Sequence, residues 1–298
     1  LGLGSSTLRS LPVNDKFQVE PEALKAAIRR DREDGYLPFC VVGAAGTTNT
    51  GAVDDLNALA DICQQEGLWF HVDGAFGAWA VLANSTRDLV AGIRRADSLA
   101  CDLHKWMYLP YEIGCVLVKR EEHQRQAFAL EPAYLAHGDG DRGMTGHDVP
   151  WLTDYGFQYS RSFRALKAWM SLRAHGTAKF ARLIQQNIDQ AHYLARLIEA
   201  VPELELMAPV SLNIVCFRFT NPDLPESALD ALNQEIVVEL QEQGIAVVSG
   251  TTLKGSYCIH LANTNHRSQR EDLDLLVRVV TRIGHEVAET IRVARMHL

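Results

Sequence analysis

Short apolar runs that each end in a polar or glycine-rich turn constrain the fold of this chain more than any other feature. They occupy residues 39–43, 68–73, 97–101 and 113–119, and helical patterns separate several of them. Strands that alternate with helices form βαβ units, which predicts a mostly parallel sheet. Ligands of such sheets bind beyond the carboxyl ends of the strands. The residues that follow the runs are therefore the first candidates for a functional site.

Helix signals and a change of pattern predict two domains. Pro21 in a first turn opens a helix that stops at Gly35, and Asp54 is the expected N-cap of a helix that ends at Gly67. Residues 1–12 are expected to be buried and to lead into a strand. We predict a large α/β domain over 1–175 and a smaller C-terminal α+β domain over 176–298. The elements expected from residue 163 on are helices at 163–175, 179–200 and 226–243, strands at 213–219, 245–248 and 257–261, and a helix from 268.

Two residues at such strand ends carry a specific chemistry. Asp73 closes the 68–73 run, and Lys105 stands in the sequence Asp-Leu-His-Lys-Trp, which begins 29 residues after Asp73. A lysine amine can join an aldehyde as a Schiff base, and a carboxylate can keep a pyridine nitrogen protonated, so the pair predicts a pyridoxal phosphate site. The alternatives are a solvated surface lysine and an aspartate in an ordinary strand-end turn.

Further candidates surround this pair. His104 would bind the cofactor phosphate or press the imine into position for catalysis, and Ser98 on the strand leading to it would bind the phosphate. His71 shares a strand face with Asp73 and would orient its carboxylate, although a core histidine is an equal alternative. Ala75 lies in a run of small residues that either admits a flat ring or allows close packing.

Two more candidates lie in loops. Thr48 offers a hydroxyl in the glycine-bounded loop 46–51, where an ordinary turn is the alternative. Tyr134 precedes the glycine-rich segment 136–150, which we expect to be a lid, and would return a proton after bond cleavage. A packed aromatic at a hinge is the alternative for Tyr134.

Composition excludes several classes of protein. The net charge of −8 without a Lys/Arg block argues against nucleic-acid binding. No apolar stretch approaches the roughly 20 residues of a membrane span. The six cysteines are scattered, which favours free thiols in the cytoplasm over disulfides or a metal site. The chain opens with Leu1 within apparent core material, so we expect an N-terminal part of the protein to be absent.

Several motifs together resemble the group II pyridoxal-phosphate-dependent amino acid decarboxylases, the family of aromatic-L-amino-acid decarboxylase. The matching segments cover most of residues 1–175 in the family's order, and a weaker match includes Arg218. They are residues 45–56, 71–77, 97–106, 132–135 and 160–167.

The resemblance implies a fold-type I enzyme with a seven-stranded large domain, a small C-terminal domain and a homodimer with shared active sites. It implies decarboxylation of an L-amino acid to an amine and CO2. Lys105 matches the Schiff-base lysine, Asp73 the pyridinium partner and His104 a pocket residue, while Thr48 and Ala75 match residues near the ring. Tyr134 matches a tyrosine on a mobile loop that protonates the carbon left by CO2.

This chain also departs from the family pattern. The family often has Asn-Pro before His-Lys, where this chain has Asp102 and Leu103, and we assign no role to Asp102. The alternatives to decarboxylation are another fold-type I reaction, such as transamination or aldehyde synthesis, and a truncated, non-catalytic relative.

Overall fold

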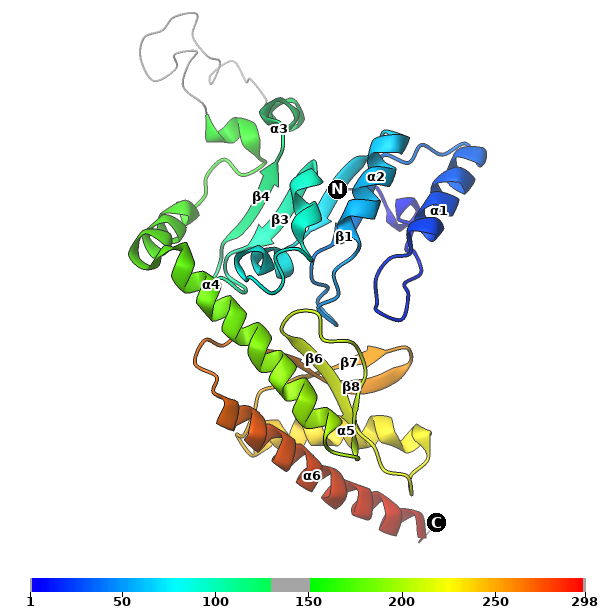
Figure 1. Cartoon of the computed structure of the whole chain (residues 1–298). Coiled ribbons are helices and arrows are strands. Elements are labelled where there is room, and N and C mark those ends of the chain that lie inside the picture. Colours follow the sequence, from blue (N-terminus) through cyan, green and yellow to red (C-terminus); the bar gives the residue numbers. More distant parts are fainter. Residues whose placement is uncertain (1, 130–150, 297–298) are drawn as a thin grey trace, which may run out of the picture.

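The computed structural model describes residues 2–129 and 151–296, and it contains two sheets connected by one long helix. In Figure 1 the sheet of the first half lies in the upper part, and the sheet of the second half lies below it. Helix α4 (Arg164–Glu199) descends from the first part along the second. This arrangement confirms the predicted α/β fold with a smaller C-terminal α+β part.

The first sheet has four strands in chain order. Strands β1, β2 and β3 are parallel and β4 is antiparallel to β3, so the sheet is mostly parallel, as predicted. The resemblance implies seven strands, of which the described residues provide these four. Their bounds are Cys40–Ala44 for β1, Trp69–Asp73 for β2, Ser98–Asp102 for β3 and Gly114–Val118 for β4.

One face of this sheet is covered better than the other. Phe70 and Val72 point into a buried core shared with α2, whereas Val42 and Val116 on the other face are 55% and 53% exposed. The helices of this part are α1 (Pro21–Glu33), α2 (Leu56–Glu66) and α3 (Glu121–Phe128), and its 3-10 turns are η1 (Ser5–Thr7), η2 (Gly77–Leu82), η3 (Ala91–Arg95) and η4 (Leu152–Tyr155).

Two local predictions for the N-terminal region are wrong. The N-cap of α2 is Asp55, which accepts from the backbone of Ala58 at 3.0 Å. Asp54 instead accepts from the backbone amides of Val19 and Ala44, each at 2.7 Å, and so ties two distant segments together. The described part of residues 1–12 is mostly exposed, and it leads to an isolated bridge between Val13 and Val19 rather than to a strand.

The second sheet is antiparallel, in the order β5-β6-β8-β7. Helices α5 and α6 pack against each other and enclose a second core with buried Phe217 and Phe219 of β6. The strand predicted at 245–248 is wrong, because β7 begins at Ser249. The bounds are Leu204–Leu206 for β5, Ile214–Phe219 for β6, Ser249–Leu253 for β7, Ser256–Ala262 for β8, Glu226–Glu242 for α5 and Arg270–Met296 for α6.

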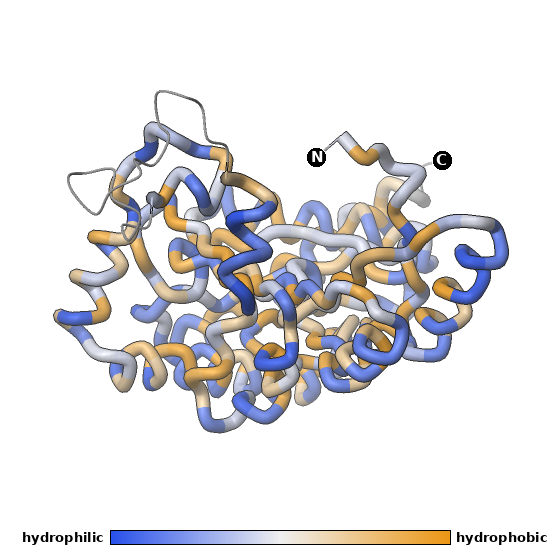
Figure 2. The backbone as a smooth tube through the Cα atoms, turned by 90° about the horizontal axis from the view of Figure 1, so that it is seen from above, coloured by the Kyte–Doolittle hydropathy of each residue, from blue (hydrophilic) through white to orange (hydrophobic). Residues whose placement is uncertain are grey.

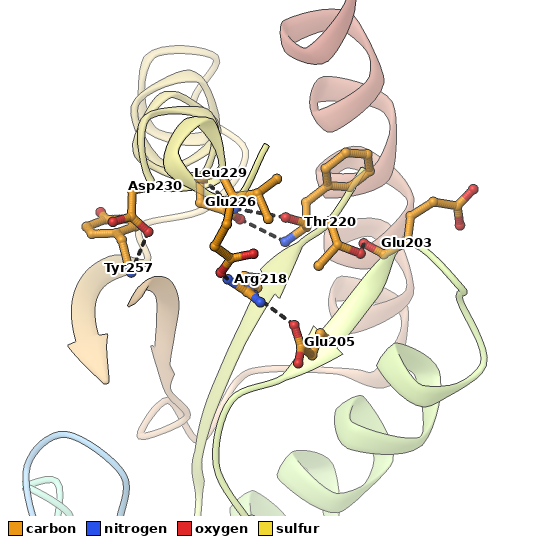
Figure 3. A network of polar contacts seen from close by, with 10 residues as sticks. Glu203, Glu205, Arg218, Thr220, Glu226, Leu229, Asp230 and Tyr257 are labelled. Atoms are coloured by element: carbon orange, nitrogen blue, oxygen red, sulfur yellow. Dashed lines mark hydrogen bonds and ion pairs between the residues drawn. The ribbon is translucent and has the colours of Figure 1, made fainter. Parts of the chain in front are cut away.

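Arg218 connects the second sheet to its covering helix (Figure 3). Its Nε donates to Glu205 on β5 at 2.8 Å, and its Nη1 donates to Glu226 at the start of α5. Burial opposes the charge of Arg218, but the two carboxylates outweigh it and raise its pKa. Arg218 therefore has a structural contact set within the C-terminal part.

Helix α4 contributes to both cores. Gly176 interrupts it with a φ of 68°, where the sequence pattern predicts the gap between two helices. Beyond that break, Ile184 and Ile188 still belong to the first core, whereas Leu194 and Ile198 belong to the second. The domain division at residue 175 stays a prediction.

Hydrophobic and hydrophilic residues alternate along the whole described chain. Figure 2 shows hydrophobic segments, in orange, interleaved with hydrophilic ones along the chain rather than gathered in one run. None of the helices in the described ranges combines the length and apolar character that crossing a membrane requires.

Candidate active site

The segments that leave β2 and β3 run side by side. Gly74 donates its backbone amide to Ala100 at 3.0 Å, and Asp102 donates to Ala75 at 3.0 Å. The ring of Phe76 stacks on that of Trp106, with centroids 5.4 Å apart and planes 8° from parallel. Asp73 and Lys105 therefore stand on neighbouring, mutually packed segments at the carboxyl ends of parallel strands.

Lys105 lies in a turn whose backbone is anchored by the next residue, Trp106. Its own side chain is 42% exposed, and Nζ lies 3.0 Å from Oδ2 of Asp102. The next residue, Trp106, is fully buried, and its Nε1 donates to Oδ1 of Asn187 on α4 at 3.1 Å. A buried anchor thus fixes the backbone while the adjacent amine faces solvent.

Asp102, to which the sequence assigned no role, directs its carboxylate at this amine. The same Oδ2 lies 3.9 Å from Nε2 of His104. Opposite, on β4, Gly114 leaves space for the carboxylate, because a Cβ there would stand 3.2 Å from Oδ1. Because the lysine end of this ion pair is 42% exposed, the pair is worth about 1 kcal/mol, and Lys105 can leave Asp102 at little cost.

His104 is oriented by the segment that leads into β4. Its Nδ1 accepts from the backbone amide of Ile113 at 3.0 Å, which places the proton of the neutral ring on Nε2. The ring packs edge-to-face on Tyr111, with centroids 4.5 Å apart. The side chain is 13% exposed, so it stands at the border of the site with a fixed orientation.

Asp73 is exposed at the end of β2, and its Oδ1 accepts from the backbone amide of Ala75 at 3.1 Å. It therefore also stabilises the turn, as the alternative interpretation requires. The glycines on either side of Ala75 serve close packing. A Cβ on Gly74 would stand 2.7 Å from Cβ of Ala78, and one on Gly77 would stand 2.3 Å from the carbonyl oxygen of Ala45.

Ser98 lies at the opposite end of β3 from Asp102, about 13 Å away at 3.3 Å per residue. Its Oγ accepts from Nε1 of Trp69 at 2.8 Å and forms a second hydrogen bond with Nδ1 of His71 at 2.7 Å, in which the tautomer of the ring decides the donor. The structure thus joins Ser98 to His71 rather than to the end of the strand where Lys105 lies. Burial lowers the pKa of His71, and the charge of Asp73 opposes that shift.

The half-buried His71 predicts a pH dependence of stability. Because the pKa of His71 is lower in the folded chain than its ordinary value of 6.5, the unfolded chain binds a proton more readily. Stability should fall as the pH drops below about 6.5. His71→Gln keeps an amide partner for Ser98 but cannot titrate, so its melting temperature should decline less between pH 7.5 and 5.

The control is His192→Gln on exposed α4, which should follow the wild-type curve. A His71→Gln curve parallel to the wild type would contradict the role given to burial.

A third loop joins the strand ends. Ala45 donates its backbone amide to Asp73 at 2.8 Å, and Gly46 approaches Gly77 so closely that a Cβ on Gly46 would stand 2.9 Å from the Cα of Gly77. Thr48 is exposed in this loop, and its carbonyl lies 3.0 Å from Nε2 of His260. The loops after β1, β2 and β3 therefore meet, as the sequence predicted.

One predicted site residue is not described by the structure, and three residues that shape the site were not predicted from the sequence. Tyr134 and the glycine-rich segment 136–150 lie outside the described residues. Phe76, Asn187 and His260 were not singled out as candidates, because their role depends on partners far away in the sequence. Among the described residues, no group of three or more histidine, cysteine or acidic side chains is suited to hold a metal ion.

A comparison with protein families identifies this arrangement. Residues 2–220 match the pyridoxal-dependent decarboxylase conserved domain. The chain belongs to the pyridoxal-dependent decarboxylase family. This confirms the resemblance on which the family prediction rested, and it makes pyridoxal phosphate the cofactor of the family.

Individual relatives agree with this placement. The chain is 34% identical over 289 residues to aromatic-L-amino-acid decarboxylase of Bacillus atrophaeus, covering 97% of this chain and 59% of the relative. It is 30% identical to histidine decarboxylase of Rattus norvegicus, covering 89% of this chain and 39% of the relative. An Oryza sativa TDC with PLP and tryptamine superposes with a TM-score of 0.87 at 26% identity, covering 96% and 59% of the two chains. The chain thus spans about half the length of these relatives.

Proposed function

We propose that the protein decarboxylates an L-amino acid to the corresponding amine and CO2, with pyridoxal phosphate held at Lys105. The observation that carries this proposal is the packing of the Lys105 segment against the Asp73 segment at the ends of β3 and β2. Family membership supports the same reaction. A bound pyridoxal phosphate supplies a protonated ring that takes up the electron pair released at the amino acid Cα.

The residues present fit this cofactor. Lys105 offers a half-exposed primary amine whose ion pair with Asp102 is weak, and Asp73 offers an exposed carboxylate. Asp73 would hold the ring nitrogen by a charge-assisted hydrogen bond. His104, Thr48 and Ala75 would border the ring. We assign the proton return at Cα to Tyr134 from its motif.

The hydroxyl of Ser98, which the sequence predicted to bind the cofactor phosphate, already has two partners. Its hydroxyl is engaged by Trp69 and His71 at the start of β3. If it affects cofactor binding, it would act through His71, which shares a strand face with Asp73.

The setting of the enzyme is also a proposal. We expect a homodimer with shared active sites, by analogy with the family. A cytoplasmic location agrees with six free cysteines, since thiols persist in reducing compartments. The aromatic amino acids are the first substrates to test, because a decarboxylase of that name is 34% identical to this chain.

The test uses the product of the complete coding sequence, saturated with pyridoxal phosphate. A panel of aromatic, acidic and aliphatic L-amino acids is assayed for CO2, amine and ammonia. We expect CO2 and amine in equal amounts from at least one amino acid. Borohydride reduction followed by peptide mapping should place the trapped cofactor on Lys105. Ammonia with an aldehyde or keto acid, or a label on another lysine, would contradict the proposal.

A further inference from the structure

The C-terminal sheet forms hydrogen bonds with the loop 46–51, which carries Thr48. His260 on β8 contacts the carbonyl oxygen of Thr48 at 3.0 Å, and Sγ of Cys216 on β6 donates to the carbonyl oxygen of Asn49 at 3.0 Å. A Cβ on Gly51 would stand 3.4 Å from Ile214 of β6. Two strands of the second sheet thus form hydrogen bonds with Thr48 and Asn49 and lie close to Gly51, from more than 160 residues away in the sequence.

The ring of His260 has a defined orientation. A carbonyl oxygen only accepts, so Nε2 donates to Thr48. In the neutral ring Nδ1 then accepts from Oγ of Ser249, 3.0 Å away on the paired strand β7, and it is nearer to that hydroxyl than the carbonyl oxygen of His260 is, at 3.4 Å. Both ring nitrogens are used, and the neutral ring carries its proton on Nε2. Ser249 therefore sets the direction in which His260 donates.

The loop is constrained by its own backbone at Gly46 and Gly51, whereas Thr48 between them is exposed. Gly46 and Gly51 adopt φ angles of 88° and 69°, which favour glycine, and Gly46 packs on Gly77 behind Asp73. Gly51 donates its amide to Thr47 at 2.8 Å. Thr48 lies between these fixed points and is exposed. The hydrogen bond from His260 therefore fixes the Thr48 peptide, and with it the direction of the threonine side chain.

We propose that His260, oriented by Ser249, is a positioning residue through which the C-terminal sheet holds Thr48 against the cofactor. This inference rests on the proposed function for the role of Thr48, but the hydrogen bond between His260 and the loop belongs to the chain itself. The second sheet thereby takes part in building the pocket of the first.

The test compares His260→Ala with His260→Gln, because the amide nitrogen of glutamine can replace Nε2 as the donor. Hydrogen exchange of the amides of residues 49–52 is measured without cofactor. We expect faster exchange in His260→Ala and near wild-type exchange in His260→Gln. Ser249→Ala should fall between them. His192→Ala on α4 serves as the control.

The second readout is the dissociation constant of pyridoxal phosphate, followed by its absorbance. Loss of one hydrogen bond predicts about five- to tenfold weaker binding for His260→Ala, and less than about twofold for His260→Gln. Unchanged loop exchange in His260→Ala, or a glutamine variant as impaired as the alanine variant, would overturn the inference. If the wild type binds no cofactor, the proposed function fails, while the exchange experiment still decides whether His260 holds the loop.

Discussion

Replacing Lys105 with alanine should lower the rate of CO2 release by at least about 10³-fold, because the amine that holds the cofactor is lost. The absorbance band of bound cofactor should disappear, and borohydride should trap none of it. The buried anchor of the segment is Trp106 rather than Lys105, so the thermal stability of the apoprotein should stay close to that of the wild type.

Two variants separate chemistry from charge. Lys105→Arg keeps a cation opposite Asp102 but cannot form an imine, so it should be as inactive as the alanine variant. Lys25→Ala removes an exposed lysine from α1 and should remain fully active. A Lys105→Ala protein that keeps more than a tenth of the wild-type rate would contradict the assignment of Lys105.

Asp102 shows how a departure from the family pattern is accommodated. The sequence alone suggests a charge that would repel a phosphate. In the structure the carboxylate lies instead against Nζ of Lys105, in the space left by Gly114. Both ends of this pair reach solvent, so its contribution is small. Position 102 is therefore compatible with an aspartate as long as the amine of Lys105 can leave its carboxylate.

Apolar runs predicted all four strands of the first sheet, and for the parallel strands β1 to β3 the reason is that such strands are continuous hydrophobic segments. The same criterion failed at 245–248, where Val247 is 96% exposed. The actual strand β7 has the sequence Ser-Gly-Thr-Thr-Leu and lies at the edge of the sheet. Because most of its side chains are exposed or half-exposed, it needs no apolar run. Asp54 was misassigned as a cap because its true partners, Val19 and Ala44, are not visible in a local pattern.

The residues of the candidate site were likewise predictable where the signal is local and unpredictable where it depends on distant partners. Asp73 and Lys105 could be located from the sequence, because strand ends are predictable and their chemistry is specific. The residues that hold the site in shape could not. Asn187 contacts Trp106 across 81 positions, and His260 contacts Thr48 across 212. Such pairs form only when the second half of the chain packs on the first.

Replacing Asn187 with leucine should destabilise the folded chain by about 3–5 kcal/mol. Asn187 is fully buried, and its Oδ1 accepts from both Nε1 of Trp106 and the hydroxyl of Tyr108. Burial raises the pKa of Tyr108, so the phenol stays a donor. Leucine has a similar size but leaves both donors without a partner, at about 1–3 kcal/mol each. Chemical denaturation of the apoprotein measures the loss.

A double-mutant cycle identifies the cause. In a Tyr108→Phe background one of the two orphaned donors is already gone, so Asn187→Leu should cost about 1–2 kcal/mol less than in the wild type. His192→Leu, on the exposed face of the same helix, should be nearly neutral. Equal costs in both backgrounds would mean that packing, not hydrogen bonding, makes Asn187 important. Because Trp106 anchors the turn of Lys105, the variant should also bind pyridoxal phosphate more weakly at temperatures where it is still folded.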